Sequence, residues 1–252
     1  MKVRHRPTLV AASLASASLA AQYVPSVLAL GQWSSWRRVP GEVCRWRGPS
    51  RACGDRPAVA LTFDDGPDPH GTPAVLDQLD ALGLRATFFC LGERAERFED
   101  LVAEIGRRGL QIETHGHRHE HHLARTPGWV GRDLAAARRA MEGCRVSPRW
   151  YRPTYGQLTG STLVAARLQG WGLVLWSAWG REWTTSDPAR VVANVSRGLG
   201  PGAIVLLHDS DRFGPDGMAD VARRALAPLA DELERRGLAA VTLDQLVDRD
   251  GL

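Results

Sequence analysis

The sequence has only four cysteines, and their spacing matches no zinc ribbon or redox motif. Cys44 and Cys53 flank a loop-like segment, and a disulfide between them fits an exported protein. Cys90 follows Thr87-Phe88-Phe89 in a strand-like run, where we expect it to be a small core residue. This cysteine usage excludes a structural zinc ribbon and a CxxC redox centre.

Dense runs of lysine and arginine are also absent, as is any interleaving of aromatic and basic residues, and this argues against a nucleic-acid partner. There are no long repeats, no low-complexity tract beyond an Ala/Ser-rich start, and no separate wall-binding module. The formal net charge is +4, with arginine dominating the basic residues, which suits an anionic surface such as a cell wall or a membrane.

Charge is missing from residues 7–36, directly after the basic Lys2, Arg4 and Arg6. The Ala/Leu/Ser-rich stretch 8–21 predicts a signal peptide. The uncharged run continues to Leu30, so an uncleaved membrane anchor is the alternative. A third interpretation is an amphipathic helix at the start of a cytoplasmic protein. We expect residues 1–30 to be a signal peptide or anchor, 31–56 a linker, and 57–252 a single catalytic domain, secreted or membrane-anchored outside the cell.

From Pro57 the chain alternates between short apolar runs and amphipathic segments, which predicts an α/β fold with a parallel sheet. About seven such units, with polar residues at nearly every strand's carboxyl end, favour a deformed (β/α) barrel of about seven parallel strands over an open sheet. The expected strands are 59–63, 86–91, 110–114, 149–152, 173–177, 203–207 and 239–242. The expected helices include 72–83, 129–144, 161–169 and 218–236.

The run Thr62–Pro67 places two adjacent carboxylates, Asp64 and Asp65, on a Gly-Pro turn after an apolar strand. Two carboxylates held close together repel each other, and a metal ion offsets that repulsion. One carboxylate can then ligate the ion while its neighbour acts as a base on water. The alternative is a plain acidic turn, because Asp, Gly and Pro all favour turns.

A histidine-rich segment follows the strand 110–114. His115 and His119 can face one point across a single turn, and two imidazoles with Asp65 form a common catalytic metal set with an open position. The alternative is a solvated His-rich loop. His117 and His121 have the wrong offset and are expected at the rim.

Three further segments place polar groups after strands. Arg152 can hold a carboxylate, and the turn 153–156 can present backbone N–H groups to an oxyanion. Three tryptophans and Glu182 lie within 176–183, which suggests a sugar-stacking wall or, alternatively, buried core aromatics. His208 leaves an apolar strand and is either a structural residue or, facing a metal site, a general acid.

Together these five segments resemble the polysaccharide deacetylase (NodB-homology) domain, carbohydrate esterase family four, over residues 57–246. The run Thr-Phe-Asp-Asp-Gly-Pro is specific for that family, and the other four segments follow in the family's order. The resemblance implies a deformed (β/α) barrel and metal-dependent hydrolysis of N-acetyl groups on a sugar polymer.

Carried onto this sequence, the resemblance assigns the metal ligands and the base. Asp65, His115 and His119 would hold a divalent ion, expected to be zinc. Asp64 would deprotonate the attacking water, and Arg152 would orient Asp64.

The remaining assignments concern the substrate. The backbone N–H of Tyr155 would help to bind the oxyanion, and His208 would protonate the departing amine. Leu206 and Trp183 would shape the acetate pocket. An amide is a poor electrophile with a poor leaving group, so its hydrolysis needs activation, a base and an acid.

Three positions depart from the family pattern. Glu182 stands where the family usually has the Asp that steadies the catalytic histidine, Trp179 where many members have another Asp, and Thr154 where Pro or an aromatic residue is commoner. No metal ligand is lost, so activity is expected to survive, with changes confined to the substrate pocket.

The expected substrate is an N-acetylhexosamine polymer, with peptidoglycan ahead of chitin-type oligomers, and the expected state is a monomer. One alternative is a metal-dependent amidohydrolase on a small non-sugar amide, because related chemistry shares this fold. Another is a carbohydrate-binding homologue that has lost catalysis, against which the intact Asp64, Asp65, His115, His119 and His208 argue.

Overall fold

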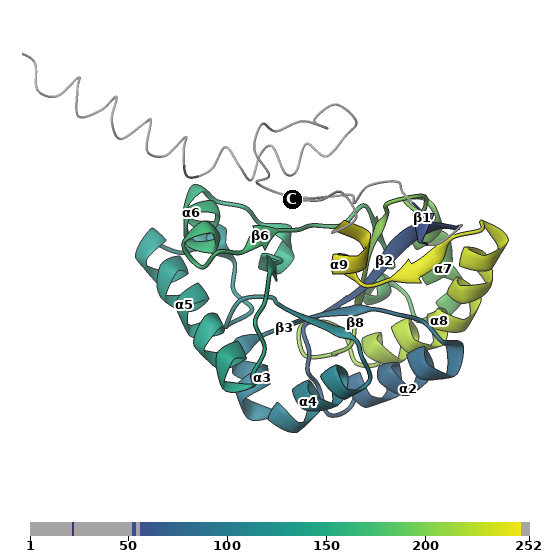
Figure 1. Ribbon diagram of the computed structural model, residues 1–252, viewed down its shortest axis with the longest axis horizontal. Helices are drawn as coiled ribbons and strands as arrows, with labels where there is room; N and C mark the ends of the chain where they lie inside the picture. Colours follow the sequence, from purple (N-terminus) through teal and green to yellow (C-terminus); the bar gives the residue numbers. More distant parts are fainter. Residues whose placement is uncertain (1–21, 23–51, 54–55, 248–252) are drawn as a thin grey trace, which may run out of the picture.

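The computed structural model describes residue 22, residues 52–53 and residues 56–247 (Figure 1). Apart from Gln22, the expected signal peptide or anchor lies outside these residues, and so does Cys44 of the expected disulfide. Within the described ranges, no helix combines the length and apolar character that a bilayer crossing needs. Ala52 and Cys53, inside the expected linker, form the short strand β1.

A curled sheet of parallel strands forms the centre of the molecule, in the order β6-β5-β4-β3-β2-β8-β7. This arrangement confirms the α/β barrel of about seven parallel strands. Strand β9 pairs in parallel with the first half of β2, and β1 pairs with the start of β2 in an antiparallel manner. The bounds are β2 Arg56–Asp64, β3 Thr87–Cys90, β4 Gln111–Thr114, β5 Trp150–Tyr151, β6 Gly172–Leu173, β7 Ala178–Trp179, β8 Ile204–His208 and β9 Ala239–Val241.

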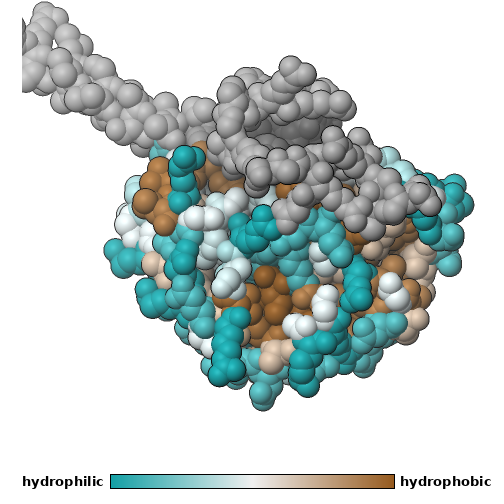
Figure 2. Space-filling model, viewed as in Figure 1, coloured by the Kyte–Doolittle hydropathy of each residue, from teal (hydrophilic) through white to brown (hydrophobic). Residues whose placement is uncertain are grey.

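Helices lie around the outside of this sheet (Figure 1). Hydrophilic residues cover most of the visible face around a central apolar area (Figure 2). Three single 3-10 turns, η1 His122–Ala124, η2 Thr154–Gly156 and η3 Glu182–Thr184, lie in the loops. The described α-helices are α2 Thr72–Leu82, α3 Gly92–Arg97, α4 Glu99–Arg107, α5 Pro127–Gly143, α6 Gly160–Leu168, α7 Pro188–Ser196, α8 Met218–Arg235 and α9 Leu243–Val247.

Local signals explain where several helices begin. Thr126 and Asp187 each accept a backbone N–H at a helix start, with a proline next in the chain. Thr159 and Thr162 form a reciprocal capping box at the start of α6. The expected helices are confirmed within a residue or two, and Gly83 ends α2 in the left-handed conformation. Helix α3 was not expected, because six residues are too few to show helical periodicity.

Side chains of β2 alternate between two environments, as a strand requires. Val59, Leu61 and Phe63 point outward and pack beneath the helices in the largest apolar cluster. Ala58 and Ala60 belong to a separate cluster on the opposite face, inside the barrel. The inner face of β2 thus begins with the small residues Ala58 and Ala60 and continues with the polar Thr62 and Asp64 toward the carboxyl end of the strand.

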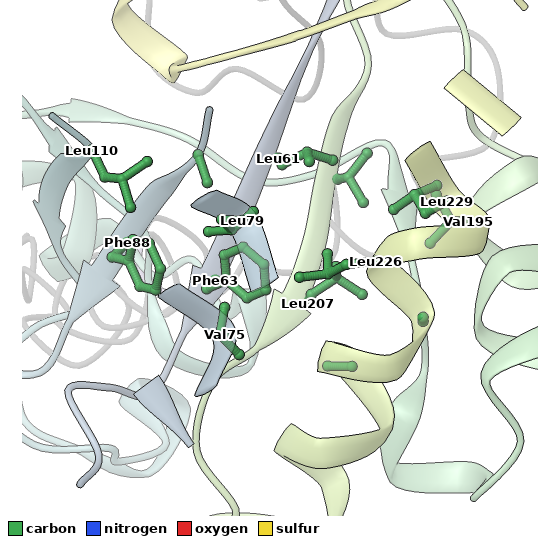
Figure 3. Close-up of a cluster of buried hydrophobic side chains, with 14 of the residues drawn as sticks. Leu61, Phe63, Val75, Leu79, Phe88, Leu110, Val195, Leu207, Leu226 and Leu229 are labelled. Atoms are coloured by element: carbon green, nitrogen blue, oxygen red, sulfur yellow. The ribbon is translucent and has the colours of Figure 1, made fainter. Parts of the chain in front are cut away.

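The outer core lies between the sheet and the helices α2 and α8. Phe63 stacks on Phe88 of the neighbouring strand, with ring centroids 5.1 Å apart. Figure 3 shows Leu79 and Val75 of α2 next to Phe63, above and below its ring in this view, and Leu226 of α8 near Leu207. Cys90, expected as a core residue, is confirmed as buried with a free thiol. This packing holds β2 and β8 rigidly behind the site.

The single strand predicted over 173–177 is wrong in its extent. Strand β6 ends at Leu173 and strand β7 begins only at Ala178, and the two strands lie at opposite edges of the sheet. Between these strands the chain crosses from one edge of the sheet to the other. Its backbone bonds show this: Val174 N donates to Tyr151 O of β5, and Ser177 N donates to Ile204 O of β8. Leu173, Val174 and Leu175 are buried, and the segment connects the two sheet edges instead of forming one regular strand.

Candidate active site

The strand register brings the expected site residues to one edge of the sheet. Asp64 at the end of β2 is directly beside His208 at the end of β8. Thr114 of β4 is beside Tyr151 of β5, so the following residues, His115 and Arg152, are neighbours too. Parallel strands end at the same side, and side chains from four distant segments therefore converge.

Asp65, His115 and His119 offer ligand atoms that all lie within 4.8 Å of one another, the arrangement that a metal ion requires. Oδ1 of Asp65 is 3.2 Å from Nε2 of His119 and 3.5 Å from Nε2 of His115. That oxygen is buried and has no hydrogen-bond partner among the described residues. A buried, unsatisfied carboxylate facing two imidazoles fits a divalent cation.

The ring of His115 is oriented by a second contact, as is usual for a metal-ligating histidine. Its Nδ1 donates to the carbonyl of Arg152 at 2.7 Å, which directs Nε2 into the site. Asp133 on α5 accepts the backbone N–H groups of His117 and Arg118, and so holds the loop between the two imidazoles. Sequence reasoning missed Asp133, because a single buried aspartate within a helix carries no motif signal.

The charges in the site favour an ionised Asp65. Burial would raise the pKa of Asp65, but the facing imidazoles of His119, His208 and His115 lower it to about 2. Burial also lowers the pKa of His115, and the nearby carboxylates only partly oppose this. A charged carboxylate and a neutral imidazole are the protonation states that bind metal.

Asp64 is held from inside the barrel by the fully buried Arg152. Nη1 of Arg152 donates to Oδ1 of Asp64 and to the hydroxyl of Thr62, each at 2.7 Å. The guanidinium also lies over the ring of Phe89, 4.0 Å from its centroid. Oδ2 of Asp64 faces His115 at 3.8 Å. The expected pairing of Arg152 with Asp64 is thus present, and Thr62 completes it.

His208 is paired with the buried Glu182. Oε1 of Glu182 accepts from the backbone N–H of His208 at 2.8 Å and lies 3.2 Å from its Nδ1. Burial would lower the pKa of His208, but Glu182, with Asp65 and Asp64 further away, raises it to about 9. The longer glutamate therefore still contacts the histidine that an aspartate usually holds in the family.

Three tryptophans line one side of this pair. Trp183 meets His208 edge to face at 5.5 Å, Trp179 meets Trp183 at 5.6 Å, and Trp176 lies 6.0 Å from Trp179. All three are half-buried. Trp176 also packs against two of the core clusters, so it is in part a core residue, as the alternative interpretation expected. Leu206 is buried two residues before His208, on the same strand face.

Tyr155 lies against the metal cluster. Its backbone is left-handed, with φ 57°, a conformation that few residues other than glycine adopt. Its ring meets His119 at 4.4 Å and stacks on His121 at 3.6 Å. His121 and His117 are outside the metal cluster, as their spacing suggested.

Phe213 is a site residue that sequence reasoning missed. It follows β8 in a Gly/Asp-rich loop, is more than a third exposed, and stacks on His119 at 4.2 Å. The sequence offered one signal for Phe213 as a site residue, its position in a loop five residues after His208, but no motif includes it.

Gly66, the residue after Asp65, stands where the turn has no space for a side chain. A Cβ on Gly66 would collide with the carboxylate of Asp209. Asp209 is buried, accepts from the hydroxyl of Thr72 at 2.5 Å, and has a pKa raised by burial to about 7. Asp209, the residue after His208, therefore packs against the turn that carries Asp65 and Gly66.

Comparisons with known proteins agree with this geometry. Residues 51–174 match the family model described as polysaccharide deacetylase. A peptidoglycan-N-acetylglucosamine deacetylase of Bacillus cereus is 34% identical over 192 residues, covering 75% of this chain and 87% of the relative. A chitooligosaccharide deacetylase of a Bradyrhizobium species is 34% identical over 197 residues, covering 75% and 90%.

A solved structure has the same architecture. It is a peptidoglycan N-acetylglucosamine deacetylase in complex with 4-naphthalen-1-yl-N-oxidanyl-benzamide, 28% identical, with a TM-score of 0.75. The match covers 86% of this chain and 98% of that one. The motifs, the barrel and these relatives agree, and the chain is a member of the polysaccharide deacetylase family.

Proposed function

We propose that this protein removes N-acetyl groups from an N-acetylhexosamine polymer and releases acetate. The observation that carries the proposal is the convergence of Asp64, the Asp65-His115-His119 cluster and His208 at one sheet edge. The relatives named above are peptidoglycan and chitooligosaccharide deacetylases, and we place peptidoglycan first. The basic net charge of +4 supports an anionic wall polymer.

Asp65, His115 and His119 hold the metal ion in this proposal, and we propose zinc, because two imidazoles and one carboxylate are a common catalytic zinc set. When bound, the ion supplies Lewis-acid activation of the amide carbonyl and of water.

The chain's own residues supply the proton transfers. Asp64 takes a proton from the attacking water on Oδ2, because Arg152 already occupies Oδ1. His208, protonated at neutral pH through Glu182, gives a proton to the departing amine nitrogen. The backbone N–H of Tyr155 stabilises the oxyanion.

The pocket walls orient the substrate. Trp183, edge-on to His208, and Leu206 bound the space for the acetyl methyl group. The tryptophans that continue from Trp183 provide stacking surfaces for sugar rings. This aromatic wall favours a sugar substrate over a small non-sugar amide.

We further propose that the protein acts outside the cell, exported or anchored by residues 1–30. The basic start followed by a long uncharged run supports this placement.

Acetate release tests the proposal. The purified full-length chain is assayed on chitooligosaccharides and on peptidoglycan, after chelation and again after zinc is added. We expect zinc-restored acetate release, and the better substrate identifies the polymer. Zinc-bound protein that releases acetate from neither polymer would point to a non-sugar amide or to a binding protein.

A further inference from the structure

An open cavity of about 680 Å³ lies beside the candidate site. It is bounded by the turn after β2, the junction of α3 and α4, and the loop between β8 and α8. One wall includes Asp68, three residues beyond Asp65, and another includes Arg212, the neighbour of Phe213. Phe213 itself stacks on His119, so this wall of the cavity is one residue away from a ring that contacts the metal cluster.

Charged side chains dominate the cavity wall, and several of them neutralise each other. Arg94 donates to Asp68 at 2.7 Å, and Arg223 donates to Asp220 at 2.7 Å. The charged lining residues are Arg94, Arg97, Arg212, Arg223, Asp68, Asp211, Asp216 and Asp220. A further carboxylate, Asp211, accepts the backbone N–H groups of Gly217 and Ala219 at 2.7 and 2.6 Å, so it is directed at the start of α8.

Two arginines remain without a carboxylate partner among the described residues, Arg97 and Arg212. Each lies over an aromatic ring instead: Arg97 is 5.3 Å from the centroid of Phe98, and Arg212 is 5.7 Å from that of Phe213. Both arginine side chains belong to exposed residues. An aromatic face positions a guanidinium without cancelling its charge, so the N–H donors stay available to a ligand.

These guanidiniums are close enough to act on Arg94. Burial lowers the pKa of Arg94 most, Asp68 raises it, and Arg212 and Arg97 lower it again. The wall holds four arginines and four aspartates, so its formal charges balance, but Arg97 and Arg212 have no carboxylate partner among the described residues and can still bind an anion.

We propose that this cavity is a subsite for carboxylate groups carried by the sugar polymer, next to the sugar that is deacetylated. Arg97 and Arg212 pair with the carboxylate, and the rings of Phe98 and Phe213 hold the two guanidiniums in place. The inference rests on the proposed function and narrows it to a glycan with carboxylates on its sugars or attached peptides, in preference to an uncharged chitooligosaccharide.

The test compares the zinc-loaded full-length chain with an R97Q/R212Q double variant. The substrates are soluble peptidoglycan fragments with free carboxylates, the same fragments with those carboxylates amidated, and chitooligosaccharides. We expect the variant to raise KM for the carboxylate fragments about tenfold and to leave KM for both uncharged substrates unchanged. Added salt should lower the wild-type preference for the charged fragments.

A matched control removes two arginines of α5, Arg132 and Arg139, which are exposed and do not line the cavity. Equal effects from the two double variants, an equal rise in KM on all substrates, or no rise on the carboxylate fragments would overturn the subsite. Binding isotherms for the same fragments separate the two proposals. Binding that the R97Q/R212Q variant loses supports the subsite even if no acetate is released, which would refute only the deacetylase function.

Discussion

Two histidines at the same sheet edge, His115 buried and His208 half-buried, have pKa values shifted in opposite directions. His115, after β4, has its pKa lowered, chiefly by burial, and its Nδ1 donates to a backbone carbonyl. His208, at the end of β8, has its pKa raised to about 9 because a buried glutamate lies against its ring. The neutral carbonyl beside His115 leaves its imidazole uncharged and suited to bind a metal. The ionised Glu182 beside His208 favours the protonated imidazole, which can act as an acid.

In the proposed mechanism, the β4 side of the site therefore holds a cation and the β8 side holds a proton. Asp64 stands between them, beside His208 in register and 3.8 Å from His115. The predictions below remove one side at a time.

The largest effect is expected on the β4 side. His119→Ala removes a ligand, so metal affinity should fall by more than the roughly 10–100-fold that loss of an outer-shell partner costs. Elemental analysis of the purified variant should show most of the zinc gone, with turnover lost in parallel. His117→Ala is the matched control, since His117 lies in the same loop outside the cluster. Full metal occupancy in His119→Ala would remove His119 from the ligand set.

The second prediction distinguishes the loss of the catalytic base from the loss of the metal ion. Asp64→Asn keeps the shape of the side chain but cannot accept the proton, so kcat should fall by about 10²–10⁴-fold. Metal content should stay near that of the wild type, because Asp64 is not among the three clustered ligands. Wild-type turnover by a correctly folded variant would show that another group is the base.

The third effect concerns the β8 side alone. An acid must be protonated, so activity should be lost as the pH rises through the pKa of His208, about 9. Glu182→Gln removes the carboxylate that raises this pKa, and burial then lowers it. The alkaline limb of kcat/KM should therefore move down by more than about one pH unit.

Metal content of Glu182→Gln should be unchanged, which distinguishes this variant from His119→Ala. Glu120→Gln, which removes a half-buried carboxylate paired with Arg125, serves as the control. An alkaline limb that stays in place would mean that Glu182 does not set the protonation of His208.

The smallest effect is expected at the rim. Phe213→Ala removes the ring stacked on His119 and a flat face beside it, so KM should rise about two- to tenfold with little change in kcat. Steady-state kinetics on a single polymer measure this split. A fall in kcat without a change in KM would instead indicate that Phe213 positions His119.

Sequence reasoning predicted the long elements well, because α2, α5 and α8 carry a sustained helical period and clear boundary residues. It did not predict α3, which is less than two turns long, or that residues 174–177 connect two edges of the sheet. An apolar run signals burial equally well for a strand and for a segment that closes a barrel. Phe213 was missed because a single loop aromatic has no period and no motif.

The sequence by itself determined which chemical groups are available: two adjacent carboxylates, two histidines one turn apart, a lone arginine and a histidine after apolar strands. Their order along the chain also determined the family. Only the tertiary structure decided their partners, because a hydrogen bond such as Arg152 to Thr62 joins residues 90 positions apart. Register between parallel strands sets those contacts, and the resulting burial and pairing set each protonation state.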